Sequence, residues 1–272
     1  MTDPFIAACI QTNSGRDLQP NIDAAETLIR DARKAGAQFI QLPENVAMLE
    51  PDDVLQREKA LPEEGHPAVE AFSRAANELA IWLLVGSVSV KLPGGKVANR
   101  SMLMDPGGHV VARYDKIHLF DVDLDNGESY RESATIEPGG HSVVAAMPWG
   151  RLGMSICYDL RFPHLYRSLA HQGADFLSIP AAFTRTTGQA HWHVLQRARA
   201  IETGCYVFAP GQCGEHAEGR LTFGHSLIID PWGTVLAEGA NDVGFILAEV
   251  DPAKVADARR KIPALSHDRP FD

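Results

Sequence analysis

The sequence has little positive charge for its length. It contains 25 Lys and Arg residues against 35 Asp and Glu residues, which gives a formal net charge of −10. Nucleic-acid phosphates attract Lys and Arg and repel carboxylates, so a binding surface for them would need the opposite balance. The composition therefore argues against nucleic acid as a partner.

Two kinds of targeting segment are also missing. The longest apolar stretch, LAIWLLVGSVSV at residues 79–90, is too short to cross a bilayer as a helix. The first residues, MTDPFIAACIQ, contain neither the basic leader nor the apolar run of a signal peptide. We expect a cytoplasmic protein that does not bind a membrane.

Cysteine is scarce and widely spaced. Cys9, Cys157, Cys205 and Cys213 form no CxxC pair, the spacing typical of redox and zinc sites. Their number and spacing indicate free thiols in a reducing compartment. The sequence has no HExxH motif either, so no motif supports a metal site.

Strand-like and helix-like patterns alternate along the chain, which favours an α/β layered domain. Strands are expected near residues 5–11, 37–43, 81–90, 152–157, 175–179, 205–210, 223–229, 234–238 and 243–249, with a hairpin over 98–115. Helices are expected near residues 20–36, 67–80, 162–172, 188–203 and 252–260. No Ser-, Pro- or Gly-rich linker divides the chain, so one domain over residues 1–272 is predicted.

Two segments of the first half are echoed in the second half. SMLMDPGGHVVA (101–112) resembles SLIIDPWGTVLA (226–237), and AGAQFIQLP (35–43) resembles QGADFLSIP (172–180). Two echoes in the same order and at similar offsets indicate halves of like topology, related by a pseudo-twofold axis. The predicted fold is a four-layer αββα sandwich, in which two sheets face each other and helices cover the outside.

Three polar residues lie where predicted strands end. Glu44 follows Pro43, whereas the matching position in the second half is Ala181; Lys116 and Cys157 end two further strands. Catalytic groups are commonly displayed at strand ends in α/β proteins. A thiol, a carboxylate and an ammonium suit acyl transfer from an amide, as nucleophile, proton carrier and oxyanion donor.

Each residue also has a structural interpretation. A lone cysteine is more often a buried small apolar side chain than a nucleophile. Glu44 and Lys116 could equally be solvated loop residues. The residues alone leave both interpretations open.

The motifs around these residues resemble a known family. QLPEN at Glu44, YDKIHLF at Lys116 and GMSICYDLRFP at Cys157 are similar to the Glu–Lys–Cys signature of the nitrilase superfamily of carbon–nitrogen hydrolases. The resemblance extends over nearly the whole chain. It implies the αββα sandwich and a thiol-dependent amidase without cofactor. It also implies a second acid, placed at Glu132, that orients substrate and Lys116.

Within the superfamily the chain resembles the Nit-type branch. HVLQRARAIETGCYVFAPGQCG (193–214) is similar to the pattern of deaminated glutathione amidases, whereas omega-amidases usually carry Asp-Asn in place of Glu202-Thr203. One departure is His193, which replaces the acid of the common AHWE motif. The implied alternatives are an omega-amidase acting on 2-oxoglutaramate or 2-oxosuccinamate, and an N-carbamoyl amide hydrolase.

A small amide that carries carboxylates needs a basic anchor near the thiol. Arg161, four residues after Cys157, and Arg185, on an expected loop, are the candidates. A structural ion pair for Arg161 and plain exposure for Arg185 are the alternatives. Tyr130, Tyr158 and Phe183 are candidate walls of the substrate pocket, and the Tyr158 backbone N–H is a candidate oxyanion donor.

Two other functional classes compete with this interpretation. A metal hydrolase could use His191 and His193, but residues two apart on a helix point to different faces. A catalytically inactive sandwich could serve as a binding partner, although all four expected polar positions are filled. The enzyme is therefore the favoured prediction.

Association is also predicted. The family resemblance implies a homodimer or higher homo-oligomer that packs through the helices near 162–172 and 188–203. The tail KIPALSHDRPFD (261–272), with two prolines, is poorly suited to a regular helix or strand. It is expected to contact a partner subunit.

Overall fold

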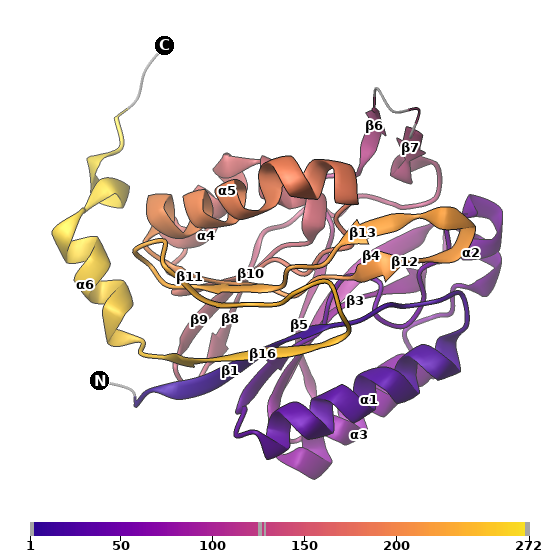
Figure 1. Ribbon diagram of the computed structural model, residues 1–272, viewed down its shortest axis with the longest axis horizontal. Coiled ribbons are helices and arrows are strands. Elements are labelled where there is room, and N and C mark those ends of the chain that lie inside the picture. Colours follow the sequence, from indigo (N-terminus) through magenta and orange to yellow (C-terminus); the bar gives the residue numbers. More distant parts are fainter. Residues whose placement is uncertain (1–2, 125–126, 128, 270–272) are drawn as a thin grey trace.

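The computed structural model describes residues 3–124, 127 and 129–269 of the chain. Two six-stranded sheets face each other, and helices cover their outer faces (Figure 1). The predicted αββα sandwich is confirmed. The last three residues of the predicted tail, 270–272, lie outside the described residues.

The first sheet has the order β16–β1–β2–β3–β4–β5. Strands β1, β2 and β3 are parallel, whereas β16, β4 and β5 run antiparallel to their neighbours. The strands are β1 (Phe5–Gln11), β2 (Phe39–Gln41), β3 (Trp82–Lys91), β4 (Val97–Met104), β5 (Val110–Asp115) and β16 (Gly244–Val250).

The second sheet repeats this topology in the order β8–β9–β10–β11–β14–β15. Again a parallel trio, here β9, β10 and β11, is flanked by antiparallel strands. The strands are β8 (Val143–Met147), β9 (Gly150–Met154), β10 (Phe176–Ser178), β11 (Tyr206–Ala209), β14 (Leu227–Ile229) and β15 (Val235–Glu238). The strand predicted near 243–249 is β16, which pairs with β1 of the first sheet and covers that strand's free edge.

Two main cores hold the layers together. Between the sheets, Phe39 and Phe208 meet edge to face with ring centroids 5.7 Å apart. Outside the first sheet, α1 buries Ile22, Ala25 and Ile29 against the strands, as its helical spacing predicts. The helices are α1 (Leu18–Lys34), α2 (Asp53–Lys59), α3 (Pro67–Leu79), α4 (Pro163–His171), α5 (Arg185–Thr203) and α6 (Ala253–Lys261).

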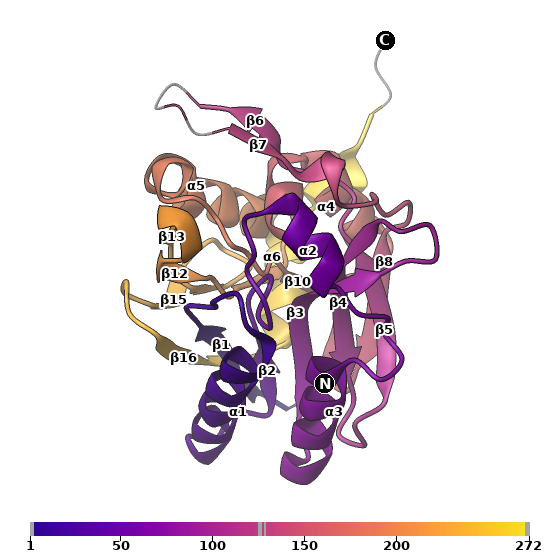
Figure 2. The same cartoon turned by 90° about the vertical axis from the view of Figure 1, so that its right-hand side faces the viewer.

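Several short elements lie at one end of the sandwich. The pairs β6 (Asp121–Asp123) with β7 (Ser129–Arg131), and β12 (Cys213–Glu215) with β13 (Leu221–Phe223), were not predicted as strands. Figure 2 shows β6 and β7 at the same end as α2. Their patterns are too short for periodicity to identify.

The described part of the C-terminal tail packs on the chain itself. Residues 264–267 form a short 3-10 helix, and Asp268 pairs with Arg167 and His171 of α4. The described part of the tail therefore lies against α4 of its own chain. In the described ranges, no helix is both long and apolar enough to cross a membrane.

Candidate active site

A tight turn after β9 presents the thiol. Cys157 has φ of +48°, a left-handed conformation that costs a non-glycine residue free energy and is commonly retained at functional sites. Its N–H donates to the carbonyl of Pro180 at 2.9 Å. The following residues, 157–161, form a 3-10 helix, and α4 begins only at Pro163. The side chain is 8% exposed.

The buried carboxylate of Asp159 holds this turn in place. It accepts hydrogen bonds from the Ile156 N–H at 2.9 Å and from the Tyr114 hydroxyl at 2.6 Å. The backbone N–H of His118 also donates to it, at 3.0 Å. Asp159 thus connects the CYD and DKIH motifs, and it fixes the residue that precedes the thiol.

Glu44 lies on the loop after β2 and is 3% exposed. Its Oε1 accepts hydrogen bonds from Lys116 Nζ and Asn99 Nδ2, both at 2.9 Å, and its Oε2 accepts the Ala182 N–H at 2.7 Å. Cys157 and Glu44 line the same cavity, and the Cys157 thiol contributes to the lowered pKa of this carboxylate. One carboxylate therefore interacts with both the ammonium and the thiol.

Lys116 follows β5 and is buried between two acids. Its Nζ lies 2.9 Å from Glu44 Oε1, and 3.0 and 2.9 Å from the two oxygens of Glu132. Glu132 is fixed in turn by the Phe120 N–H at 2.7 Å. The structure thus brings together all four residues that sequence reasoning assigned to catalysis.

Gln212, the glutamine of the QCG motif, binds the loop that carries Glu44 through its side-chain amide. Its Nε2 donates to the Glu44 carbonyl at 3.0 Å and to the Ser14 hydroxyl at 2.8 Å. Gly86 of β3 lies so close that a Cβ there would meet the Leu42 carbonyl oxygen at 1.9 Å. Both contacts restrict where the Glu44 carboxylate can lie.

Burial and neighbouring charges shift the pKa values of the Glu44 carboxyl group and the Cys157 thiol. Burial alone would raise the pKa of Glu44, but the Lys116 ammonium and the hydrogen bonds to the carboxylate outweigh it and lower that pKa. Burial and the Glu44 charge raise the pKa of the Cys157 thiol well above its usual value. The Glu44 carboxyl group therefore favours its charged form, and the Cys157 thiol favours its neutral form.

Lys116 remains charged in this setting. Burial would lower the pKa of its ammonium, but the Glu132 and Glu44 carboxylates together raise that pKa well above the usual value. The resting cluster therefore holds a neutral thiol, a carboxylate and an ammonium. In that state Glu44 can take a proton when the thiol attacks.

The cluster opens into a cavity of about 180 Å³. The cavity is lined by the three aromatic residues predicted to form its walls, Tyr130, Tyr158 and Phe183. The other lining residues are Glu44, Asn45, Leu49, Glu50, Pro51, Asp53, Gln56, Lys116, Phe120, Ser129, Arg131, Glu132, Cys157, Ala182, Thr184, Thr187 and Arg220. The lining therefore comes largely from segments that follow β2, β5, β9 and β10, from α2 and β7, and from the start of α5.

The predicted basic anchors do not line this cavity. Arg185 was expected on a loop, but it is the exposed first residue of α5. The Arg161 guanidinium lies 5.1 Å from the Phe183 ring centroid and contacts His191 Nδ1 at 3.2 Å. Instead, Arg131 and Arg220 reach the lining. Sequence spacing could not find them, because neither is near Cys157 in the chain.

The two lining arginines differ in their partners. Arg131 forms a bidentate ion pair with Asp123, with contacts of 2.7 and 2.8 Å. Arg220 has no carboxylate partner among the described residues, and its Nε is buried without a hydrogen bond. Its guanidinium lies 5.6 Å from the Tyr130 ring centroid. Arg220 is therefore the cation at the cavity that is able to accept an anionic group.

Comparisons with known proteins agree with this geometry. A family model described as carbon-nitrogen hydrolase matches residues 6–260. The chain is similar to the deaminated glutathione amidase of Synechocystis sp., with 43% identity over 270 residues, 97% of this chain and 98% of that protein.

Two solved structures extend the similarity. The C. elegans NitFhit protein has a TM-score of 0.92 at 36% identity, covering 98% of this chain and 66% of that one. Saccharomyces cerevisiae Nit3, described as a member of branch 10 of the nitrilase superfamily, has a TM-score of 0.87 at 30% identity, covering 96% and 94%.

Proposed function

Because the chain belongs to the carbon–nitrogen hydrolases of the nitrilase superfamily and acts on amide C–N bonds, we propose that Cys157 is its nucleophile and that Glu44, Lys116 and Glu132 complete the catalytic set. The observation that carries the proposal is the Glu44 carboxylate, which lies 2.9 Å from the Lys116 ammonium and lines the same cavity as the Cys157 thiol.

The reaction proceeds in two halves. The Cys157 sulfur attacks the amide carbonyl carbon while its proton passes to Glu44, which then protonates the departing amine. The enzyme is left as a thioester. Glu44 next takes a proton from water, the hydroxide attacks the thioester carbonyl, and the thiol regains its proton as the carboxylic acid leaves.

The negative charge that develops on the carbonyl oxygen needs fixed donors. Lys116 provides a buried ammonium beside the thiol, and Glu132 holds it from the other side at 2.9 Å. Tyr158 provides a backbone N–H in the first turn of the 3-10 helix, where such groups have no intrahelical acceptor. Both donors exist before the reaction and require no rearrangement, which is the property that makes such sites effective.

The proposed substrate is deaminated glutathione, a 2-oxoglutaramyl-type amide that carries carboxylates. Two observations support it: the similar full-length relative bears that name, and the cavity wall includes Arg220 without a carboxylate partner among the described residues. Arg220 replaces Arg161 and Arg185 as the proposed anchor, since a guanidinium binds a carboxylate through paired hydrogen bonds.

A panel of amides tests the activity and the substrate together. It contains deaminated glutathione, 2-oxoglutaramate, an N-carbamoyl amine and a simple nitrile, with detection of the released acid and of ammonia or amine. We expect the highest kcat/KM for deaminated glutathione, and no turnover by Cys157→Ala. A preference for any other member would overturn the substrate assignment while leaving the thiol mechanism testable.

Arg220→Met and Arg220→Lys test the anchor. We expect the methionine variant to raise KM about 10- to 100-fold with a smaller effect on kcat, because one charge-assisted pair contributes about 1.5–3 kcal/mol. Lysine should restore part of the affinity. Arg185→Met, outside the cavity, is the matched control, and an equal effect of both methionine variants would disprove the anchor.

We also propose that residues 1–272 form one domain and that two copies associate through α4 and α5. On α5 the apolar side chains of Val194 and Ile201 are 68% and 52% exposed, an arrangement typical of a surface that meets a partner. The described tail packs on α4 and would lie at this interface. Sedimentation of the wild type and of Val194→Glu tests it, and a wild-type monomer would overturn it.

A further inference from the structure

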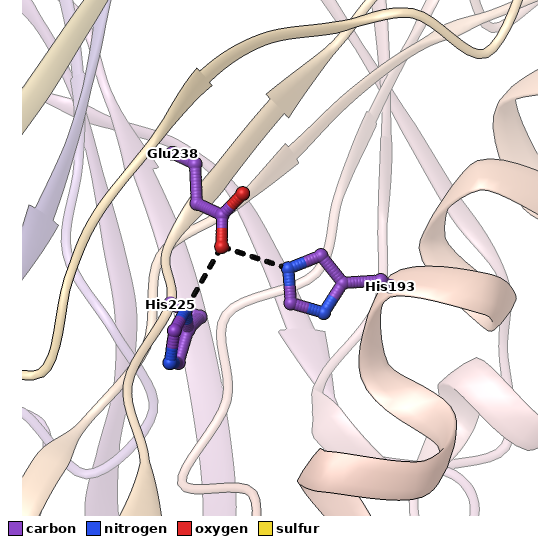
Figure 3. Close-up of side chains that lie close together, drawn as sticks. All are labelled: His193, His225 and Glu238. Atoms are coloured by element: carbon purple, nitrogen blue, oxygen red, sulfur yellow. Dashed lines mark hydrogen bonds and ion pairs between the residues drawn. The ribbon is translucent and has the colours of Figure 1, made fainter.

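Three potential metal ligands meet on the surface of the second sheet, away from the catalytic cluster. His193 comes from α5, His225 from the connection between β13 and β14, and Glu238 from the end of β15 (Figure 3). His193 Nε2 and His225 Nδ1 each lie 2.9 Å from the same Glu238 oxygen. None of the three residues lines the catalytic cavity.

We propose that His193, His225 and Glu238 bind one divalent transition-metal ion of the zinc class. Two imidazoles and one carboxylate form a donor set that suits Zn²⁺. All the ligand atoms lie within 4.8 Å of one another. At metal–ligand distances of about 2.0–2.2 Å, they would need to stand only about 3–3.5 Å apart, so the side chains need to move little.

The protonation of the ligands is compatible with coordination. A neutral imidazole carries one proton, which either ring nitrogen can hold. In the metal-bound form, His193 coordinates through Nε2 with its proton on Nδ1, and His225 coordinates through Nδ1 with its proton on Nε2. The two hydrogen bonds to Glu238 are then replaced by three bonds to the ion.

Neighbouring residues hold His225 in a backbone conformation that residues other than glycine rarely adopt. His225 has φ of +50°, and its carbonyl accepts the Trp192 indole N–H at 2.7 Å. Its ring stacks on Phe223, with centroids 4.4 Å apart. A left-handed non-glycine residue persists only where its neighbours enforce it, as at ligand-binding positions.

The cluster is open enough for an ion to enter. The three side chains are between 24% and 41% exposed, which leaves one side of the cluster to water ligands. Within the described part of the chain, Glu238 forms ion pairs with these two histidines and with no lysine or arginine. No fixed positive charge therefore competes directly with the ion for Glu238.

Coordination would add a link between α5 and two segments, the β13–β14 connection and the end of β15, that backbone hydrogen bonds already join to each other. The ion would tie α5 to the β13–β14 connection and to β15. Thr184 and Thr187, at the start of α5, line the catalytic cavity. The consequence expected from this position is greater stability of the folded chain, since a ligand that binds only the folded state stabilises it. The ion takes no part in the proposed reaction.

The test is titration calorimetry with ZnCl2 on EDTA-treated, dialysed protein. Cys157→Ala serves as the parent, so that zinc bound at the active-site thiol is not counted. We expect one ion per chain. His193→Gln, His225→Gln and Glu238→Gln should each lower the affinity at least about tenfold, because even groups that only orient a ligand commonly contribute that much.

His191→Gln is the matched control, since it lies two residues from His193 on the same helix and instead contacts Arg161 at 3.2 Å. It should bind zinc as the parent does. Circular dichroism without zinc establishes that each variant is folded. Zinc should raise the thermal midpoint of the parent and of the control, but not that of the three ligand variants.

Any of three results would overturn the proposal. The first is no saturable binding of a single ion by the parent. The second is unchanged affinity in folded His193→Gln, a substitution on the helix surface that leaves the His225 backbone untouched. Equal weakening by His191→Gln and His193→Gln would also reject it, because the ion would then sit on the HWH pair of α5.

Discussion

After β2, the chain turns at Pro43 and continues with Glu44; after β10, it turns at Pro180 and continues with Ala181. The two loops occupy matching places in the two sheets, but they supply different groups. The first loop carries a carboxylate. The second supplies backbone: Ala182 donates its N–H to Glu44, and Pro180 accepts the N–H of Cys157. One half therefore provides the base, and the other holds it in position.

The difference has an electrostatic reason. Two carboxylates, Glu44 and Glu132, already flank the Lys116 ammonium. A third buried carboxylate at position 181 would add a like charge without a partner, which costs several kcal/mol in a buried site. A carboxylate is therefore expected to be tolerated in the first loop but not in the second.

Glu44→Ala tests the difference between the two loops, because both loops then carry alanine at the matching position. We expect turnover to fall on the order of 10⁴-fold, because both halves of the reaction need this base. Measurement of acid release from deaminated glutathione checks it. Cys157→Ala should fall at least as far, and both should keep the circular dichroism of the wild type. A Glu44→Ala enzyme with more than about a tenth of wild-type turnover would remove Glu44 from the mechanism.

Lys116→Met tests what the charge between the two acids contributes. We expect a loss on the order of 10²–10³ in kcat, the usual cost of removing one oxyanion donor. The pKa of Glu44 should also rise, because Lys116 is the cation that lowers it. The acid limb of kcat/KM should therefore move to higher pH in the variant. Near-normal turnover at position 116 would refute the role.

Alanine substitution of one glycine in each sheet should lower the free energy of unfolding by different amounts. A Cβ on Gly86 would meet the Leu42 carbonyl oxygen at 1.9 Å, whereas one on Gly153 would meet the Leu169 Cβ at 3.1 Å. Gly86→Ala should lower the free energy of unfolding by about 3 kcal/mol, and Gly153→Ala by about 1 kcal/mol, because backbone yields less readily than side chains. Urea denaturation measures both, and the opposite order would contradict the close approach at the Glu44 loop.

The smallest effect concerns pH. The lowered pKa of Glu44 and the raised pKa of Cys157 keep the carboxylate–thiol pair in place across neutral pH. We expect kcat/KM to be nearly flat from about pH 6 to 8, without the rise of an enzyme that needs a preformed thiolate. A rate that climbs tenfold per pH unit over this range would contradict the neutral-thiol state.

The same groups shape the stability of the wild type against pH. Glu44 contributes stability above the ordinary carboxyl pKa of about 4.3, and that contribution is lost as the pH falls through its lower folded value. Lys116 contributes fully below its ordinary pKa of about 10.4, and that contribution is lost as the pH rises through its higher folded value. Thermal midpoints between these limits should vary little.

Much of the site was visible from the sequence because its residues sit inside recognisable motifs. Glu44, Lys116 and Cys157 each end a predicted strand, and the packing of the two sheets brings these ends together. The supporting residues were not visible. Asn99, Asp159 and Gln212 act through contacts to residues remote in the chain, and no periodicity marks them.

The amino-acid sequence by itself determined the alternation of strands and helices, the repeat of the two halves and the three reactive side chains, since these follow from local patterning and composition. Tertiary structure alone decided which cation reaches the cavity, which proton state the thiol keeps, and that His193 meets His225 and Glu238. Those properties depend on distances between remote residues and on burial, and both arise only when the two sheets pack together.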